Sequence, residues 1–386
     1  MSACATLPRN PIPADRAFDA EIDGIPGARA WGGIVSEDFM DDLVLSRKQE
    51  SPGQFAVDDD GWPIYDMLAL SGGGATGAFG AGFLNGWSET GERPDFKLVS
   101  GISTGALIAP LAFLGAQQDE LLKSVFTSVE TENILEKLSL FAIIFRSESV
   151  ATTGPLKALI DQFFDEEFLQ KVAQRHNQGY RLYIGTHHMD AQRLVVWNMG
   201  LIANSSHPDA PELFRNIVLA SASIPVVFPP VMIDSVVDGE TYDEMHVDGG
   251  VSVQVFINAG TFDVPAALAA ASGLGEKEVP VIRGNVYIIR NGQLSSSFQE
   301  IPRELGRITA RALDSMIKIS SVGDLYRIYS FSQRGNFGFY YSSVPDDYVA
   351  NSQEPFDRAE MNRLFEIGFE QGASGEAWRT TPPGFN

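Results

Sequence analysis

The 386-residue sequence contains a single cysteine, Cys4, and only five histidines. One cysteine excludes an intrachain disulfide and any metal site built as a cage of cysteines. No apolar run approaches the roughly 18 residues of a membrane-spanning helix, and the longest one covers only residues 140–145. Basic residues are scarce, 28 against 50 acidic ones, which gives a formal net charge of −22. Because such a surface repels phosphate backbones, we expect no nucleic-acid partner.

The order of apolar segments predicts an α/β protein. An apolar strand at 67–71 precedes a glycine-rich turn and a helical stretch, and a second strand at 96–100 precedes an apolar helix at 106–114. Strand, turn and helix repeated in this order imply parallel strands joined by crossover helices. We therefore expect a three-layer α/β/α fold with a largely parallel central sheet. Later in the chain we expect a further strand and two amphipathic helices that close the sheet, at 286–289, 299–320 and 355–372.

Composition indicates how the chain is organised. Residues 1–65 are rich in Pro, Gly and Asp and have no sustained hydrophobic period, which predicts an extended N-terminal arm. We expect one catalytic domain over 66–375, with its motifs within about 66–255, and a C-terminal tail at 376–386. The Leu- and Phe-rich stretch 121–168 has two interpretations, a lid or acyl-chain groove and ordinary core helices.

Ser103 is the candidate nucleophile. It lies in the sequence Gly101-Ile102-Ser103-Thr104-Gly105, between the second strand and the helix that follows it. A nucleophilic serine in this motif occupies a strained turn, and the flanking Gly101 and Gly105 let the backbone pass close by. At a helix N-terminus, unpaired N–H groups and the helix dipole favour developing negative charge. The alternative is a tight structural turn without a catalytic role.

The glycine run 72–74 has two functional interpretations. Backbone N–H groups of Gly72, Gly73 and Gly74 can converge on the oxyanion of a tetrahedral intermediate. The spacing Gly72-x-Gly74-x-x-Gly77 also matches a dinucleotide-binding fingerprint. That fingerprint requires an acidic residue at the end of the second strand, where this sequence has Ser103 instead. We therefore favour the oxyanion hole.

Asp248 is the candidate partner of the serine. A hydrolase triad of the usual α/β type places its histidine late in the chain, yet no histidine follows His246. Asp248 ends a short strand, and Gly249 and Gly250 behind it allow a substrate or the nucleophile loop to approach closely. An ordinary Asp-Gly turn at the end of a strand is the alternative.

The histidines have structural explanations. His246 lies two residues before Asp248 and therefore on the same face of its strand. We expect His246 to be structural rather than to assist Asp248. His187 and His188 lie between two apolar segments, where we expect a hairpin turn with both rings in solvent.

Taken together, these motifs resemble the patatin-like phospholipase family. The motifs fall in the family's order and include a segment rich in Ala and Ser that leads to Phe-Pro-Pro. They are Gly72-Gly73-Gly74-x-Thr76-Gly77, Gly101-x-Ser103-x-Gly105, Ala220-Ser221-Ala222-Ser223-Ile224-Pro225 with Phe228-Pro229-Pro230, and Asp248-Gly249-Gly250. The match covers about residues 66–255, and the ordered combination is far more specific than any single motif.

The resemblance implies a serine lipid acyl hydrolase of the phospholipase A or lysophospholipase type. Ser103 would attack the ester, Asp248 would act as general base without a histidine, and an acyl-enzyme would form. The oxyanion would be held by backbone N–H groups, and further glycines would support the motifs. These positions are Gly72, Gly73, Gly74 and Thr104 for the oxyanion, and Gly77, Gly101, Gly105, Gly249 and Gly250 for support. The implied partners are lipid esters and a membrane surface, and no metal or other cofactor is implied.

Two departures from the family pattern concern the headgroup preference. Thr76 stands where many members carry Arg or Lys, which leaves less positive charge near the oxyanion. After Gly250 the frequent Asn-x-Pro is missing, and Val251-Ser252-Val253-Gln254 stands in its place. Neither departure removes a catalytic group.

Cys4 follows Ser2 and Ala3 and resembles the lipobox of a bacterial lipoprotein, and a bacterial subset of the family carries such an N-terminus. The apolar signal segment that should precede a lipobox is absent from the sequence as written. We therefore expect either a lipid-anchored protein of the bacterial envelope, if that segment lies upstream, or a cytoplasmic protein as written.

Two other classes of protein compete with the hydrolase. A catalytically silent, lipid-binding envelope protein with the same fold would ignore active-site acylating reagents, and the intact Ser103 and Asp248 argue against it. A nucleotide-binding oxidoreductase is disfavoured because the second strand leads to Ser103 and not to an acidic residue. Binding of labelled NAD would indicate such an enzyme.

Overall fold

The computed structural model describes residues 8–59, 61–128, 136–137, 149, 151–273, 283–352, 354 and 356–385. Its strands are β1 (Arg29–Trp31), β2 (Ile64–Leu70), β3 (Leu98–Gly101), β4 (Glu136–Lys137), β5 (Ala151–Thr152), β6 (Arg181–His188), β7 (Arg193–Asn198), β8 (Val231–Val237), β9 (Glu240–Asp248), β10 (Arg283–Arg290) and β11 (Gly338–Ser343). Its α-helices are α1 (Glu37–Gln49), α2 (Gly77–Glu89), α3 (Thr104–Leu114), α4 (Asp119–Thr127), α7 (Gly154–Phe163), α8 (Glu166–Asn177), α9 (Met199–Ala203), α10 (Ala210–Ser221), α11 (Val264–Ser272), α12 (Leu305–Gly335) and α13 (Arg358–Ser374).

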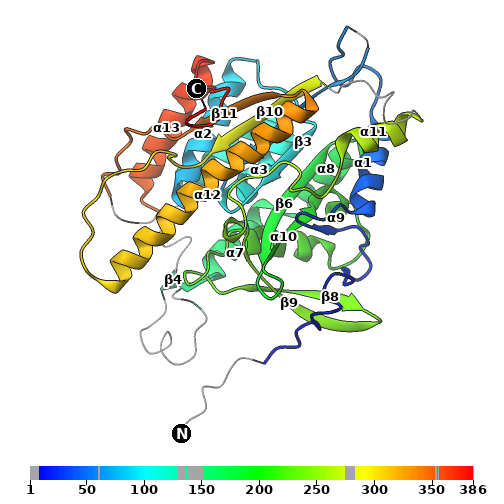
Figure 1. Cartoon of the computed structure of the whole chain (residues 1–386), viewed down its shortest axis with the longest axis horizontal. Helices are drawn as coiled ribbons and strands as arrows, with labels where there is room; N and C mark the ends of the chain where they lie inside the picture. Colours follow the sequence, from blue (N-terminus) through cyan, green and yellow to red (C-terminus); the bar gives the residue numbers. More distant parts are fainter. Residues whose placement is uncertain are drawn as a thin grey trace. The chain divides into compact units, whose positions relative to one another are not determined.

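The chain forms two compact units. Unit 1 comprises Met1–Ser51, Val129–Ser252 and Asn258–Val279. Unit 2 comprises Pro52–Ser128, Val253–Ile257 and Pro280–Asn386. Figure 1 labels many of their elements, numbered in chain order.

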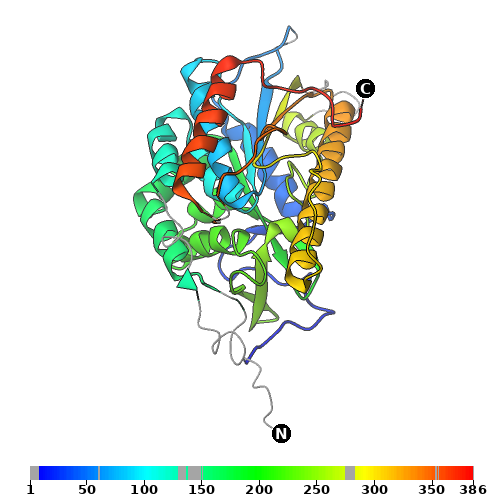
Figure 2. The same ribbon diagram turned by 90° about the vertical axis from the view of Figure 1, so that its left-hand side faces the viewer.

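Unit 2 contains a parallel sheet in the order β3-β2-β10-β11. The last four residues of β2 are fully or almost fully buried, as an apolar strand covered on both faces should be. Helix α2 packs against α4 and α13, whereas α12 packs against β10 and β11. Figure 2 shows α13, in red, and α12, in orange, on opposite sides of the strands of this unit. Unit 2 is therefore a sheet between two helical layers.

Unit 1 contains an antiparallel sheet in the order β1-β7-β6-β9-β8. Every residue of β6 is buried, because the strand pairs with β7 and β9 and is covered by α9 and α10. Strands β8 and β9 form a long hairpin, visible in Figure 1. The last residue of β9 is Asp248, so this sheet positions the candidate base.

The structure confirms the α/β class and the sheet flanked by helices. The strands and helices around the glycine run and Ser103 lie where the sequence predicts them, and 286–289 falls within β10. The strands of unit 2 pair parallel, as predicted, and those of unit 1 pair antiparallel. Among the described helices, none combines the length and the apolar character needed to cross a bilayer.

Regular structure also occurs where the sequence predicts little. The expected arm contains β1 and α1, and α1 begins at an N-cap in which Ser36 Oγ accepts from Phe39 N–H. The buried residues of α1 are Phe39, Asp42 and Ser46, so its inward face is mostly polar and has no apolar period. The expected tail is also packed: the ring centroid of Trp378 lies 4.9 Å from those of Phe83 and Trp87.

His187 and His188 are not in solvent. Both lie on β6, with 8% and 0% of their surface exposed. The turn that follows begins only after His188, so the rings are inside the strand. The prediction of two solvated histidines at a hairpin turn is therefore wrong.

Candidate active site

Ser103 occupies a strained turn between β3 and α3. Its backbone has φ 56° and ψ −125°, a conformation that residues with a side chain rarely adopt. Its residue surface is only 6% exposed. A methyl group on Gly105 would come 2.3 Å from the Leu70 carbonyl oxygen, so only glycine fits there. The turn is therefore built around Ser103 at the N-terminus of a helix, where N–H groups have no partner within the helix.

The glycine loop (Gly72–Gly74) lies beside this serine within unit 2. A methyl group on Gly72 would lie 3.1 Å from Ser103 Cβ and 3.7 Å from its Oγ. A methyl group on Gly77 would lie 2.2 Å from Thr104 Oγ1, so α2 and α3 begin side by side. The structure thus brings together Ser103, Thr104 and the glycine loop, as the motifs predict for one half of the site.

Arg290 and Asn291, at the end of β10, hold the glycine loop in place. The Arg290 guanidinium donates to Ser71 Oγ at 2.9 Å and to the Gly72 carbonyl. Asn291 donates from its backbone N–H to Ser71 Oγ and from Nδ2 to the Ser71 carbonyl, both at 2.8 Å. Burial lowers the pKa of Arg290 to about 10, which leaves the guanidinium charged at neutral pH. A buried cation therefore lies directly behind the loop.

This anchoring sets the direction of one peptide group. In a trans peptide the C=O and N–H point in opposite directions, so the Gly72 carbonyl that faces Arg290 turns the Gly73 N–H to the other side. Within the described ranges, no group accepts a hydrogen bond from Gly73 N–H. Gly74 follows with φ +59°, which glycine adopts without strain. The loop thus presents a backbone donor that the fold itself does not use.

Asp248 lies in unit 1, at the end of β9, and is 5% exposed. Its Oδ1 accepts from Gly250 N–H at 2.7 Å, and its own N–H donates to the Ser223 carbonyl at 3.0 Å. The register places it opposite Thr186 of β6. The structure therefore joins the Asp-Gly-Gly motif to the Ala- and Ser-rich motif that contains Ser223.

The two halves of the candidate site belong to different units. Ser103, Thr104 and the glycines at 72, 73, 74, 77, 101 and 105 are in unit 2, whereas Asp248, Gly249 and Gly250 are in unit 1. The chain passes from Asp248 to Gln254 of unit 2 within six residues, and the Gln254 carbonyl accepts from Gly72 N–H at 3.2 Å. The pairing of Ser103 with Asp248 remains a prediction. Cys4 lies outside the described residues, as do residues 129–135, 138–148 and 150 of the stretch 121–168, predicted as a lid or core helices.

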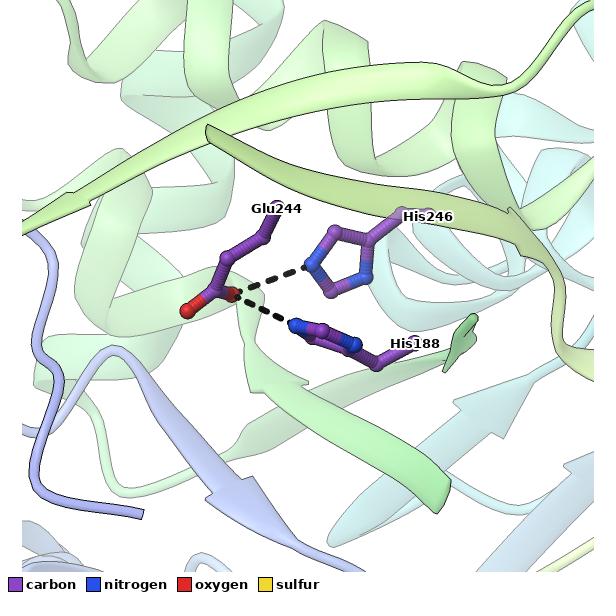
Figure 3. Close-up of side chains that lie close together, drawn as sticks. All are labelled: His188, Glu244 and His246. Carbon is purple, nitrogen blue, oxygen red and sulfur yellow. Dashed lines mark hydrogen bonds and ion pairs between the residues drawn. The ribbon is translucent and has the colours of Figure 1, made fainter. Parts of the chain in front are cut away.

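A buried ionic network precedes Asp248 on the same strand. Glu244 forms an ion pair with Arg29, and its Oε2 lies 3.3 Å from His246 Nε2 and 3.6 Å from His188 Nε2. Figure 3 shows both rings directed at the carboxylate. Glu244, His188 and His246 are each 0% exposed. The prediction that His246 is structural agrees with this position inside the network.

The network does not fit a resident metal ion, although two histidines and a glutamate are residue types that hold Zn²⁺. His188 Nδ1 accepts from Ala191 N–H at 3.2 Å, so the ring proton of neutral His188 is on Nε2. Nε2 is the atom that would have to bind the metal, and a metal-bound histidine donates its other ring N–H instead of accepting there. Arg29 already balances the charge of Glu244. The cluster is an ionic network in which His188 Nε2 lies 3.6 Å from Glu244 Oε2 without a hydrogen bond.

We expect this network to make the protein less stable in acid. Burial lowers the pKa of His246 to about 4, against about 6.5 in an unfolded chain. Between these values the unfolded state binds a proton that the folded state does not, so the free energy of unfolding falls as the pH drops from 6.5 towards 4. Urea unfolding at a series of pH values measures the slope.

In His246→Gln the slope of the unfolding free energy against pH should decrease by an amount that corresponds to up to one bound proton. His207→Gln is the control, because its side chain is 27% exposed and it lies outside the network. His176, whose pKa burial lowers to about 3, contributes to the slope with the same sign and remains in both variants. An unchanged slope in His246→Gln would contradict the lowered pKa of His246 as a source of the acid sensitivity.

Comparison with known proteins agrees with the motifs. Residues 68–258 match the family model described as "Patatin-like phospholipase". Among solved structures, VipD from Legionella pneumophila is 12% identical at a TM-score of 0.40, over 85% of this chain and 70% of that chain. The type III effector protein ExoU is 14% identical at a TM-score of 0.20, over 81% of this chain and 54% of that chain. No curated protein sequence matches this chain.

Proposed function

The chain belongs to the patatin-like phospholipase family through residues 68–258, and on this premise we propose that it is a serine lipid acyl hydrolase. Ser103 is the proposed nucleophile and Asp248 the proposed general base. The reaction is hydrolysis of carboxylic ester bonds in phospholipids or related lipid esters through an acyl-enzyme. The observation that carries the proposal is the positive φ of Ser103 between two close-packed glycines at the start of α3.

The proposed reaction has two steps. Ser103 Oγ attacks the ester carbonyl carbon while its proton passes to Asp248, and the tetrahedral intermediate collapses with release of the alcohol, which takes up that proton. Water then attacks the acyl-enzyme and gives its proton to Asp248, which passes it to Ser103 Oγ as the fatty acid leaves. Because a carboxylate is a weak base for an alcohol, burial of Asp248 and close placement must assist the transfer.

The oxyanion of the intermediate would be held by backbone N–H groups of the glycine loop and Thr104. The unused Gly73 N–H supports this role, and the N–H of Thr104 lies at the start of a helix, where the dipole favours negative charge. Arg290 acts through the loop as a positioning residue. Its buried charge also offsets the absence of a basic side chain at Thr76.

We expect Arg290→Met to lower kcat for ester hydrolysis by about 10²-fold, because a misdirected oxyanion donor loses most of its stabilising effect. KM for a short ester should change by less than about threefold, since the loop binds the intermediate rather than the ground state. Arg290→Lys should restore part of kcat, because a lysine keeps the charge without the planar fork. Arg283→Met, on an exposed position of the same strand, is the control. Equal activity of Arg290→Met and the control would exclude the positioning role.

The substrate class follows from the family and is tested directly. We propose lipid esters at a membrane surface as the substrates, with peripheral association or lipid attachment at Cys4 as the means of reaching it. The test measures fatty acid released from phospholipid vesicles, beside nitrophenyl esters from acetyl to palmitoyl. Release by the wild type, with a preference for long chains, supports the proposal. Cleavage of acetyl esters alone would indicate a small-ester hydrolase, and inert wild type would favour the silent lipid-binding protein.

A further inference from the structure

The first half of α12 exposes a stripe of large apolar side chains. Leu305, Ile308, Met316 and Ile319 have 84%, 52%, 66% and 73% of their surface exposed. Their spacing places them on one side of the helix, because residues three and four apart are neighbours on a helical surface. Phe298, in the segment before the helix, is 100% exposed. We call these five residues the α12 stripe.

The charged residues of the same stretch face the other way. Arg311, Asp314 and Lys318 are each half-buried, and Asp314 lies 3.2 Å from Arg311 and 3.6 Å from Lys318. Arg311 also donates to the Ser297 carbonyl. A helix on the surface of a globular protein normally turns its apolar face to the core and its charges to water. This half of α12 does the opposite.

The second half of α12 anchors the helix in unit 2. Leu325 and Ile328 are buried, and the buried Asp324 accepts from Gln254 N–H at 2.6 Å. Figures 1 and 2 both show the first half of α12 extending away from the strands that its second half covers. The stripe is therefore carried on a helix that is fixed at its other end.

Exposure of this stripe is energetically costly. Burying a large aliphatic or aromatic side chain is favoured over leaving it in water. Contiguous apolar patches on a protein surface mark sites of interaction with a protein, a ligand or a membrane. Each of the four helical residues of the stripe keeps more than half of its surface exposed with all described residues in place.

We propose that the α12 stripe is the surface by which this protein docks on a lipid bilayer. This inference rests on the proposed function, which requires the enzyme to reach esters in a membrane. A helix that lies in the membrane interface inserts its apolar side chains and keeps basic residues at the headgroups. Phe298, Leu305, Met316 and Ile319 supply the apolar contact.

Charge favours a lipid surface over a second acidic protein molecule. The whole chain carries −22, yet the stretch that carries the stripe also exposes Arg303 and Arg307, and the half-buried Asp314 is paired with two basic residues. Glu300 and Glu304 are exposed in the same stretch, so these four exposed charges cancel. Two copies of so acidic a chain repel each other, whereas a bilayer of zwitterionic lipid does not repel it, and the stretch around the stripe is locally neutral.

The test compares two triple variants. The stripe variant carries Leu305→Gln, Met316→Gln and Ile319→Gln, because glutamine is compatible with a helix. The control variant carries Leu45→Gln, Val57→Gln and Val349→Gln, three exposed apolar residues that do not belong to α12. Each protein is measured for co-sedimentation with phosphatidylcholine vesicles, with and without phosphatidylserine, for hydrolysis of nitrophenyl butyrate in solution, for thermal unfolding and for mass in solution.

The stripe variant should bind vesicles at least about tenfold more weakly than wild type, while the control variant binds normally. Hydrolysis of nitrophenyl butyrate and the unfolding temperature should stay at wild-type values in both variants. Arg303→Glu with Arg307→Glu should weaken binding mainly to the vesicles that contain phosphatidylserine. Wild-type vesicle affinity in the stripe variant would overturn the proposal. A wild-type dimer that the stripe variant loses, without a change in vesicle binding, would assign the stripe to a second copy of the chain instead.

The outcomes separate this inference from the proposed function. Vesicle binding that depends on the stripe, in a wild type that hydrolyses no ester, leaves the docking surface intact and contradicts the hydrolase. If the wild type hydrolyses nitrophenyl butyrate but does not bind vesicles, the hydrolase is supported and the docking surface is contradicted. If the stripe variant unfolds at a lower temperature than wild type, vesicle binding by the variant with Arg303→Glu and Arg307→Glu decides instead, because both substitutions are at exposed positions.

Discussion

Ser103→Ala is expected to lower ester hydrolysis by about 10³-fold or more, because no acyl-enzyme can form without the nucleophile. Asp248→Asn should lower it on the order of 10³-fold, since the amide cannot accept the serine proton. The amide oxygen of the introduced asparagine could still accept from Gly250 N–H as Asp248 does, so the strand end should persist. Rates on nitrophenyl butyrate, with circular dichroism as a check on folding, provide the measurement. Full activity in either variant would contradict the proposed role of that residue.

A second substitution at the same position tests the strained backbone. Replacing alanine by glycine normally lowers stability, because glycine loses more conformational entropy on folding. At a φ of 56° the order should reverse, so Ser103→Gly should be more stable than Ser103→Ala by about 1 kcal/mol. Both variants should be inactive. If Ser103→Gly is the less stable of the two, the turn is not strained as described.

Glu244→Gln should lower the free energy of unfolding by about 3–5 kcal/mol, because removing one partner of a buried ion pair leaves the other charge uncompensated. The remaining charge is Arg29, whose side chain is 5% exposed. The control is Asp190→Asn, which breaks the ion pair with Arg9 at 2.7 Å on a side chain that is 42% exposed. The control should cost less than about 1 kcal/mol. Urea unfolding compares the two.

A double variant then distinguishes charge from packing. Adding Arg29→Met to Glu244→Gln should recover part of the lost stability, because the uncompensated charge is gone. Recovery will be incomplete, since Arg29 also donates to the Ala20 carbonyl at 2.8 Å. If Glu244→Gln alone costs no more than Asp190→Asn, the network contributes little to the fold.

The parts of the site that the sequence predicts are those built from neighbouring residues. The glycine loop and the turn at Ser103 each need only one strand, one turn and one helix, and glycine spacing reveals both. The proximity of Gly72 to Ser103 follows because β2 and β3 are adjacent parallel strands whose C-terminal ends lie together. Local patterns therefore suffice for this half.

The parts that the sequence does not predict depend on contacts between distant residues. Arg290 reaches the glycine loop from a strand 218 residues later, and no motif marks it. Helix α1 escapes detection because its inward residues include Asp42, which accepts from the buried Arg181 at 2.6 Å. The local pattern assigns His188 to a turn, and only the pairing of β6 with β9 places it against His246.

Covalent labelling shows whether Ser103 is the nucleophile. A fluorophosphonate with an alkyl chain, which phosphonylates activated serines with loss of fluoride, is incubated with the wild type and the protein is digested for mass spectrometry. The account predicts one adduct, on Ser103, and loss of esterase activity in proportion to its formation. The adduct should be absent from Ser103→Ala and form much more slowly in Asp248→Asn. An active wild type that carries no adduct on Ser103, or carries it on another residue, would contradict the account.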